Sequence, residues 1–213
     1  MYQGVIIMAK QKNKIRMNLP NKITIIRIIM AIFIIVIMVL PFDMIGIRLP
    51  QFFVNEKLVV DTKYIISGVL FILASVTDFI DGKIARSHNM VTDFGKLIDA
   101  IADKILVNSV LILLAASGDI HPIIPVIVIV RDSIVNSIKM IAASKGKVVA
   151  AIKSGKIKTA CLMTGIALTL FYNMPFEFIN LRVADFLLFV ATVLSLYSGI
   201  QYYILNKDIL FED

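Results

Sequence analysis

Five aspartates are grouped in one short stretch of a chain that is otherwise rich in aliphatic side chains. Asp78 and Asp81 are three residues apart, and Asp99 and Asp103 are four residues apart. On a helix, each of these spacings puts two side chains on one face. Asp93 stands alone between the pairs, where it is interpreted as an exposed or N-capping residue. The sequence therefore predicts two acidic helix faces, separated by a turn that lets them meet.

Four carboxylates that converge repel one another unless a cation neutralises them. Their oxygen atoms are ligands that Mg²⁺ and Mn²⁺ prefer, and His88 is the only Cys or His nearby. Four acids are enough to hold two such ions, which can clamp a phosphoryl group and activate an attacking oxygen. Three small residues between the pairs permit close approach of a ligand: Gly82, Ala85 and Gly95. Because Arg86 adds donors that match a phosphate, the stretch predicts metal-dependent handling of a phosphate compound.

The elements that position these acids are expected to be membrane helices. Hydrophobic residues make up 59% of the 213 positions, above the roughly 45 to 50% of soluble domains. Six apolar runs approach the ~20 residues that cross a bilayer core, at about 23–40, 64–77, 97–118, 121–143, 157–173 and 183–205. The runs do not alternate in polarity as barrel strands do, so helices are favoured. We expect an all-α, polytopic bundle of six transmembrane helices.

The expected organisation is a basic N-terminal tail, one catalytic helical domain and a short C-terminal tail, at residues 1–20, 21–207 and 208–213. Lys and Arg are numerous before the first run, between runs two and three, and between runs four and five. Because such residues are enriched on the cytoplasmic side, both termini and the acidic pairs are expected there. The formal net charge of +7 fits this topology and contact with anionic membrane lipids, so nucleic acid is not an expected partner.

The remaining global features are modest. The single Cys161 excludes a disulfide framework within the chain. The apolar stretch at the N-terminus is too short for a secretory signal and precedes the basic residues, so no cleavage is expected. Met8 and Met17 are alternative starts. Organelle-targeting features are lacking, and the expected location is a bacterial plasma (inner) membrane.

The acidic stretch resembles the signature of the CDP-alcohol phosphotransferase family, D-x-x-D-G-x-x-A-R-x8-G-x3-D-x3-D. All of its fixed positions match, namely Asp78, Asp81, Gly82, Ala85, Arg86, Gly95, Asp99 and Asp103. The resemblance implies a six-helix membrane enzyme, usually a homodimer. It also implies transfer of a phosphatidyl group from CDP-diacylglycerol to an alcohol, with release of CMP.

The resemblance also implies roles for individual residues. The expected ligands of two Mg²⁺ or Mn²⁺ ions are Asp78, Asp81, Asp99 and Asp103. Asp103 is in addition the expected base for the acceptor hydroxyl. Residues expected at the nucleotide and its diphosphate are Asp78, Gly82, Ala85, Arg86, Thr92 and Gly95. Asn21 and Thr24, at the start of the first run, add polar groups that can meet the headgroup of the CDP-lipid.

Three further stretches resemble the subgroup of this family that uses glycerol 3-phosphate: residues 18–28, 130–133 and 154–160. Arg131 lies inside an expected span, where a charge is costly and usually functional. A second phosphate-binding site is therefore predicted at Arg131, Lys139, Lys156 and Lys158. The alternative is a structural pairing of Arg131 with Asp132, next to lysines that merely follow the positive-inside rule.

Three more residues inside the runs receive structural interpretations. Arg27 lies about one turn inside the first run, from where its side chain is expected to snorkel to the cytoplasmic surface. Gly165 and Gly199 are interpreted as packing positions within apolar helices.

The expected function is transfer of the phosphatidyl group of CDP-diacylglycerol to sn-glycerol 3-phosphate, which yields phosphatidylglycerophosphate and CMP. Inositol phosphate, which also carries a phosphate, is an alternative acceptor within the family. An ion-coupled membrane transporter is an alternative of a different class, since acids inside a membrane also relay protons or bind cations. The acids of a transporter are expected along a path through several spans, whereas these crowd one helix-turn-helix.

Overall fold

The structure is a computed structural model that describes residues 19–47, 49–54, 58–87 and 93–211. Within these ranges the chain forms the six helices that the apolar runs predict. They are α1 (Leu19–Val39), α2 (Thr62–Ser87), α3 (Asp93–Ala116), α4 (Ile123–Ser144), α5 (Lys153–Leu170) and α6 (Val183–Phe211). The smaller elements are two 3₁₀ helices and a pair of strands: η1 (Phe42–Ile45), η2 (Phe176–Ile179), β1 (Gln51–Val54) and β2 (Leu58–Asp61). The predicted all-α class is confirmed.

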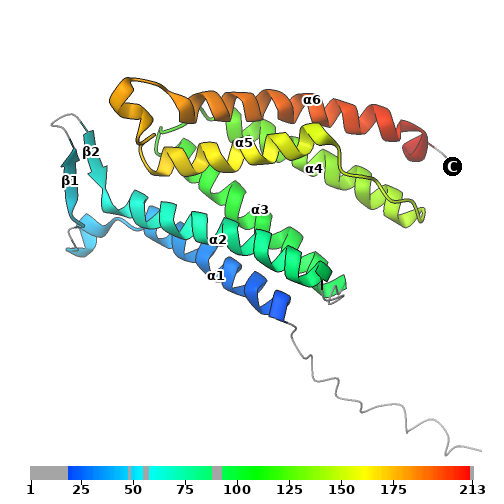
Figure 1. Ribbon diagram of the computed structural model, residues 1–213, viewed down its shortest axis with the longest axis horizontal. Coiled ribbons are helices and arrows are strands. Elements are labelled where there is room, and N and C mark those ends of the chain that lie inside the picture. Colours follow the sequence, from blue (N-terminus) through cyan, green and yellow to red (C-terminus); the bar gives the residue numbers. More distant parts are fainter. Residues whose placement is uncertain (1–18, 48, 55–57, 88–92, 212–213) are drawn as a thin grey trace, which may run out of the picture.

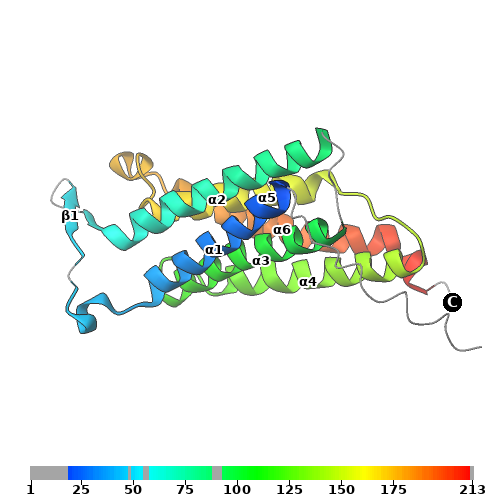
Figure 2. The same ribbon diagram turned by 90° about the horizontal axis from the view of Figure 1, so that it is seen from below.

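The helices run along the long axis of the molecule and form two groups of three (Figures 1 and 2). In the N-terminal group α1 packs against α2 and α3, and in the C-terminal group α6 packs against α4 and α5. The groups meet where α2 contacts α5 and where α3 contacts α4. Each group carries one of the two sets of charged residues that the sequence singles out.

Two helices extend further into the acidic stretch than the apolar runs suggest. α2 continues through both of its aspartates to Ser87, and α3 already begins at Asp93. Hydropathy falls where acids appear, but an acid on the site-facing side of a helix does not end the helix. At the other end of α3, Gly118 has a φ of 83°, a left-handed conformation that glycine adopts without strain. Pro122 is then the N-cap residue of α4, at the helix start, where proline is tolerated.

The core is aliphatic and draws on all six helices. Its fully buried side chains include Ile34, Phe71, Leu111, Val128, Leu162 and Leu188. The outer faces are also apolar: on α6, Phe186, Phe189 and Ile200 are each at least 60% exposed. A helix that is apolar on its outer as well as its inner face is typical of a membrane span. By length and composition, two stretches of the described helices are able to cross a membrane, Asn21–Val39 and Val183–Leu210.

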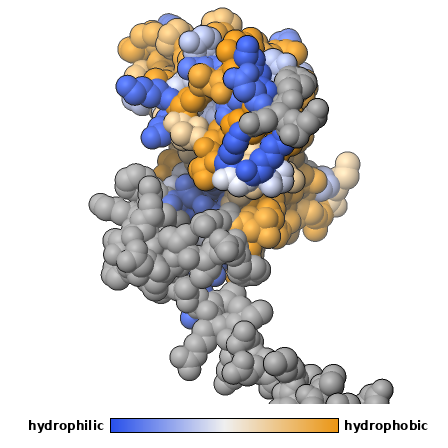
Figure 3. All heavy atoms as spheres, turned by 90° about the vertical axis from the view of Figure 1, so that its right-hand side faces the viewer, coloured by the Kyte–Doolittle hydropathy of each residue, from blue (hydrophilic) through white to orange (hydrophobic). Residues whose placement is uncertain are grey.

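The two ends of the bundle differ. The start of α1, the end of α2 and the end of α6 lie at one end, called the site end below (Figure 1). Figure 3 views the molecule from this end and shows hydrophilic residues grouped there among hydrophobic ones. The opposite end carries a hairpin that the sequence analysis did not predict, in which Phe52 pairs with Val60 and Phe53 with Val59. Its strands are too short to be distinguished from a loop by periodicity.

Candidate active site

Three aspartates of the sequence signature converge at the site end. Asp78 comes from α2, while Asp99 and Asp103 come from successive turns of α3. One carboxylate oxygen of each lies within 4.8 Å of one oxygen of each of the others. Their side chains are 32%, 45% and 47% exposed, so a ligand from outside can reach them. This all-oxygen set fits a hard divalent cation such as Mg²⁺ or Mn²⁺.

A fourth charged residue lies at the centre of this cluster, and the sequence analysis missed its role. Nη1 of Arg27, on α1, is 2.7 Å from Asp78 Oδ1, 2.9 Å from Asp99 Oδ1 and 3.1 Å from Asp103 Oδ1. The Arg27 side chain is fully buried. The interpretation that it snorkels to the surface is therefore wrong, because its helix face packs on the two acid-bearing helices instead of facing outward.

A spacing signal for Arg27 was present in the sequence. Asn21, Thr24 and Arg27 follow one another at intervals of three residues, and all three are buried in the structure. The stripe continues with the buried Ala31 and Ile34, so it is the inner face of α1. Polar residues on the inner face of an otherwise apolar helix require partners inside the bundle. For Arg27 those partners are the acids of α2 and α3.

The remaining signature residues are placed only by their backbone or lie outside the described residues. The backbone of α2 carries four of them through its last turns: Asp81, Gly82, Ala85 and Arg86. Their side chains lie outside the described part of the structure, as does the whole of Thr92. Gly95 is in the first turn of α3 and half-buried. The predicted participation of these residues in metal or nucleotide binding stays a prediction.

A second charged cluster lies in the C-terminal group. Arg131 Nη1 is 2.8 Å from Asp132 Oδ1, and Lys158 Nζ is 3.0 Å from both carboxylate oxygens of Asp132. Arg131 also donates a hydrogen bond to Ser198 Oγ at 2.7 Å, and its guanidinium lies 5.5 Å from the centre of the Tyr202 ring. The Arg131–Asp132 pair, which the sequence offers as the structural alternative, is therefore present. The Asp132 carboxylate contacts both Arg131 and Lys158.

The four residues predicted to bind the acceptor phosphate line one cavity of about 730 Å³. Arg131 and Lys139 reach it from α4, while Lys156 and Lys158 reach it from α5. Lys139 and Lys156 are exposed, whereas Lys158 is only 3% exposed and engaged with Asp132. The cavity therefore offers a concentrated positive charge, of the kind that binds a phosphate dianion.

The basic cavity adjoins the acidic cluster through α3. Lys104 lines the cavity, and it directly follows Asp103 in the chain. The sequence analysis did not predict a role for Lys104 or for the α6 residues Ser198 and Tyr202. Ser198 and Tyr202 are four residues apart and so share a helix face, but nothing in the sequence showed which face meets Arg131.

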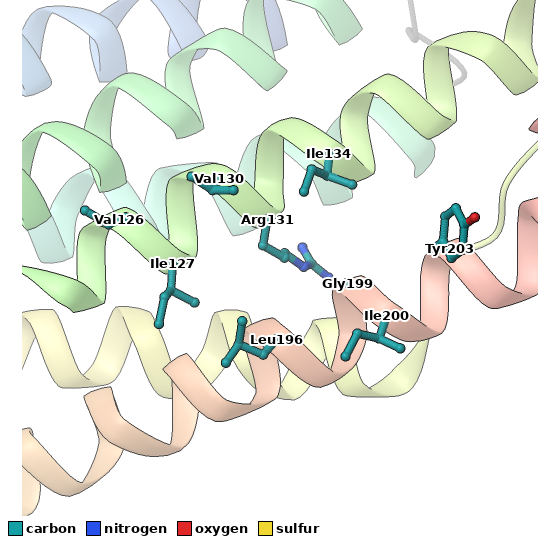
Figure 4. A pocket seen from close by; sticks show the side chains of 9 residues that line it. All are labelled: Val126, Ile127, Val130, Arg131, Ile134, Leu196, Gly199, Ile200 and Tyr203. Carbon is teal, nitrogen blue, oxygen red and sulfur yellow. The ribbon is translucent and has the colours of Figure 1, made fainter.

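Two glycines provide the space in which the Arg131 side chain runs from α4 toward α6 (Figure 4). A Cβ atom on Gly199 would lie 3.0 Å from Arg131 Cγ, and one on Gly155 would lie 3.4 Å from Arg131 Nη2. Between them, α4 and α6 also frame an apolar groove of about 440 Å³ that both Arg131 and Gly199 line. Gly199 is thus a packing position, as predicted, and the residue that it accommodates is Arg131.

A further acid that the sequence places near a span lies away from both clusters. Asp185 is in the first turn of α6, and α6 starts at the end of the bundle opposite to the site end (Figure 1). Its side chain is 53% exposed and pairs with Arg182 at 3.2 Å. It extends neither cluster.

The fold and the two clusters define a class of protein, and sequence comparison gives the same class. The CDP-alcohol phosphatidyltransferase family matches residues 17–201, and the chain belongs to this family. The CDP-diacylglycerol–glycerol-3-phosphate 3-phosphatidyltransferase of Bacillus subtilis is 39% identical over 194 residues, which are 91% of this chain and 97% of that protein. The protein of the same name from Rickettsia bellii is 33% identical, over 89% of this chain and 96% of its own length.

A solved structure has the same fold. The apo crystal structure of the phosphatidylinositol phosphate synthase of Mycobacterium tuberculosis matches with a TM-score of 0.57, over 91% of this chain and 93% of that one. Sequence identity over this match is 19%. Divalent-metal dependence is typical of the family, in agreement with the cluster of three aspartates. The chain is accordingly a membrane-associated member of this transferase family, with bacterial relatives.

Proposed function

We propose that the protein transfers the phosphatidyl group of CDP-diacylglycerol to sn-glycerol 3-phosphate, with formation of phosphatidylglycerophosphate and CMP. One observation carries this proposal: an acidic cluster suited to a metal and a basic cavity suited to a phosphate adjoin at Asp103 and Lys104. The donor carries a diphosphate and this acceptor carries a phosphate, so each cluster has a ligand of the opposite charge. The names of the relatives from Bacillus and Rickettsia support the same acceptor.

On the donor side, the proposed metal ligands are Asp78, Asp81, Asp99 and Asp103. Divalent ions held there would neutralise charge on the diphosphate and stabilise the departing CMP. Asn21, Thr24, Gly82, Ala85, Arg86, Thr92 and Gly95 are proposed to contact the CDP-lipid. Gly82 directly follows the first acidic pair and Arg86 comes about one helical turn later, where a position without a side chain and a donor fork suit a diphosphate.

On the acceptor side, Arg131, Lys139, Lys156 and Lys158 are proposed to bind the phosphate of glycerol 3-phosphate. The carboxylate of Asp103 accepts the proton of the acceptor hydroxyl as its oxygen attacks the β-phosphorus. The bond between that phosphorus and the oxygen that bridges to the CMP phosphate breaks, and the bridging oxygen leaves with CMP. Asp103 suits this role because it belongs to the acidic cluster and directly precedes Lys104, which lines the cavity.

The proposed setting is a bacterial plasma membrane, crossed by all six helices of one domain over residues 21–207. Both termini and the site end face the cytoplasm in this topology, because the basic connections cluster there. The charges of the two clusters lower the hydropathy of α2 to α5, while their outer faces stay apolar. A homodimer is proposed by analogy with the family.

A reconstitution experiment tests the proposal. Purified protein receives labelled CDP-diacylglycerol, Mg²⁺ and separate acceptors: glycerol 3-phosphate, inositol phosphate, serine and phosphatidylglycerol. We expect CMP release that depends on glycerol 3-phosphate. Release with inositol phosphate instead would change the acceptor and keep the class of reaction. If no acceptor supports release, the enzyme function is wrong and the ion-coupled transporter becomes the better hypothesis.

A further inference from the structure

We propose that Arg27 is the built-in counter-charge of the acidic cluster: it holds the three aspartates together when no metal is bound, and a divalent cation competes with it for their oxygens. The inference rests on the proposed metal-dependent function and extends it to a residue of α1 outside the family signature. Arg27 is therefore assigned a positioning role, and no step of the phosphatidyl transfer is assigned to it.

One atom of Arg27 lies where the three carboxylates meet. Nη1 of Arg27 has an oxygen of three different carboxylates within 3.1 Å. A guanidinium nitrogen of this kind carries two hydrogens, so three directed hydrogen bonds from it are not possible. The arrangement is better described as a positive charge at the point where three carboxylate oxygens converge. Convergence of carboxylate oxygens is also what a hard divalent cation requires.

The charges of the described side chains do not cancel within the cluster. Three carboxylates and one guanidinium leave a surplus of two negative charges. Without Arg27 the surplus would be three, among oxygens that lie within 4.8 Å of one another. Like charges at that separation in a partly buried site repel strongly unless a cation is present. One divalent cation brings the described cluster with Arg27 to neutrality.

Arg27 and the aspartates that it contacts differ in burial. The Arg27 side chain is 0% exposed, whereas the acids it contacts are 32% to 47% exposed. A cation from outside therefore approaches the exposed side of the carboxylates, while Arg27 stays behind them. A buried arginine that loses its partners is costly, so Arg27 keeps part of its contact after the metal binds. Arg27 thus substitutes for the metal: its contacts with the three carboxylates are strongest without a metal ion and weaker when one is bound.

Thermal unfolding of the full chain in detergent tests this role, with excess EDTA or with excess Mn²⁺. We expect Arg27→Gln to lower the Tm in EDTA by about 5 °C or more, because three acids lose their counter-charge. Mn²⁺ should recover most of that loss, so the Tm rise on adding Mn²⁺ is larger in the variant than in the original chain. Arg27→Lys, which keeps the charge, should lose less. Arg182→Gln, at an 85% exposed arginine, is the matched control and should change neither value.

A direct measurement of Mn²⁺ binding shows whether Arg27 competes with the metal for the carboxylate oxygens or helps the metal to bind. If Arg27 competes for the oxygens, the Mn²⁺ dissociation constant of Arg27→Gln is lower than that of the original chain, in line with its larger Tm rise. A dissociation constant that is unchanged or raised, or a Tm loss of the same size with and without Mn²⁺, would overturn the proposal. These readouts do not use the transfer reaction. A chain that passes them but releases no CMP would contradict the proposed function alone.

A double variant keeps the test usable if Arg27→Gln does not fold. Arg27→Gln combined with Asp78→Asn removes one positive and one negative charge from the cluster. We expect the double variant to be more stable in EDTA than Arg27→Gln, because the two effects are coupled through charge. Equal or lower stability of the double variant would show that Arg27 acts by filling space, and the proposal would fail.

Discussion

The two charged clusters of this protein are built in opposite ways. In the N-terminal group one buried cation, Arg27, lies among three carboxylates, and in the C-terminal group one carboxylate, Asp132, lies between two cations. Among the described side chains, each cluster uses a single counter-charge to hold like charges together in an apolar bundle. The surplus differs: two negative charges in the first and one positive charge in the second. The sign of the surplus decides which ligand each cluster can attract.

The clusters also differ in which charges are accessible. In the acidic cluster the surplus charges are the exposed ones, and the counter-charge is buried. In the basic cluster the surplus is buried, since Lys158 and Arg131 have side chains only 4% and 12% exposed. The exposed charges of the cavity are Lys104, Lys139 and Lys156 instead. The acidic cluster is therefore arranged for direct ligation of a cation, whereas the basic cluster adds to the positive potential of the three exposed lysines.

Removal of the metal should have the largest effect and should act through the acidic cluster alone. A chelator is expected to abolish CMP release completely, because the diphosphate loses its charge neutralisation. Mg²⁺ or Mn²⁺ added in excess should restore it. Release that persists after dialysis against EDTA, with metal content verified by elemental analysis, would contradict the function assigned to the acidic cluster.

Asp103→Asn is expected to lower CMP release by about 10³-fold, since a neutral amide cannot accept the acceptor proton. The amide keeps the shape of the side chain, so the variant should stay folded, as a melting curve can verify. Asp185→Asn, at the opposite end of the bundle, is the matched control and should retain full turnover. Undiminished turnover in Asp103→Asn would remove Asp103 from the mechanism.

Arg131→Gln should distinguish a phosphate binder from a purely structural partner of Asp132. Loss of a charge-assisted hydrogen bond costs about 1.5 to 3 kcal/mol, which corresponds to an acceptor KM raised roughly 10- to 100-fold. The KM for CDP-diacylglycerol should change little, and Lys207→Gln on the exposed face of α6 should change neither. If both KM values shift equally, Arg131 serves the structure of the cluster instead.

Gly199→Ala should produce the smallest effect and should act through Arg131. The added methyl group would lie 3.0 Å from Arg131 Cγ and displace that side chain. We expect the acceptor KM to rise about threefold to tenfold, equivalent to about 1 kcal/mol. In the control Gly165→Ala the methyl group would contact Leu188 at 2.9 Å, so stability should fall with no selective change in acceptor KM. If Gly199→Ala also lowers stability without a selective change in acceptor KM, Gly199 has no specific role in the acceptor site.

Much of the fold could be predicted because local rules govern it. Long apolar runs predict helices, and the i, i+3 and i, i+4 spacings of the acids predict shared faces that the structure brings together for Asp78, Asp99 and Asp103. The β1–β2 hairpin was missed because its strands have four residues each, too few for a periodic signal. Arg27 was misinterpreted because its distance from the helix start suggested access to the surface, whereas its partners lie on two other helices.

The sequence by itself determined the helices, the acidic pairs, the basic residues and the family, because each is carried by composition or by spacing along the chain. Only the tertiary structure decided that Arg27 closes the acidic cluster, that Asp132 joins Arg131 to Lys158, and that Lys104 links the two sites. The decisive contacts join residues on different helices: Arg27 of α1 meets acids of α2 and α3, and Asp132 of α4 meets Lys158 of α5. Their existence depends on how the helices rotate and pack, and helical periodicity along one segment does not specify which face meets which neighbour.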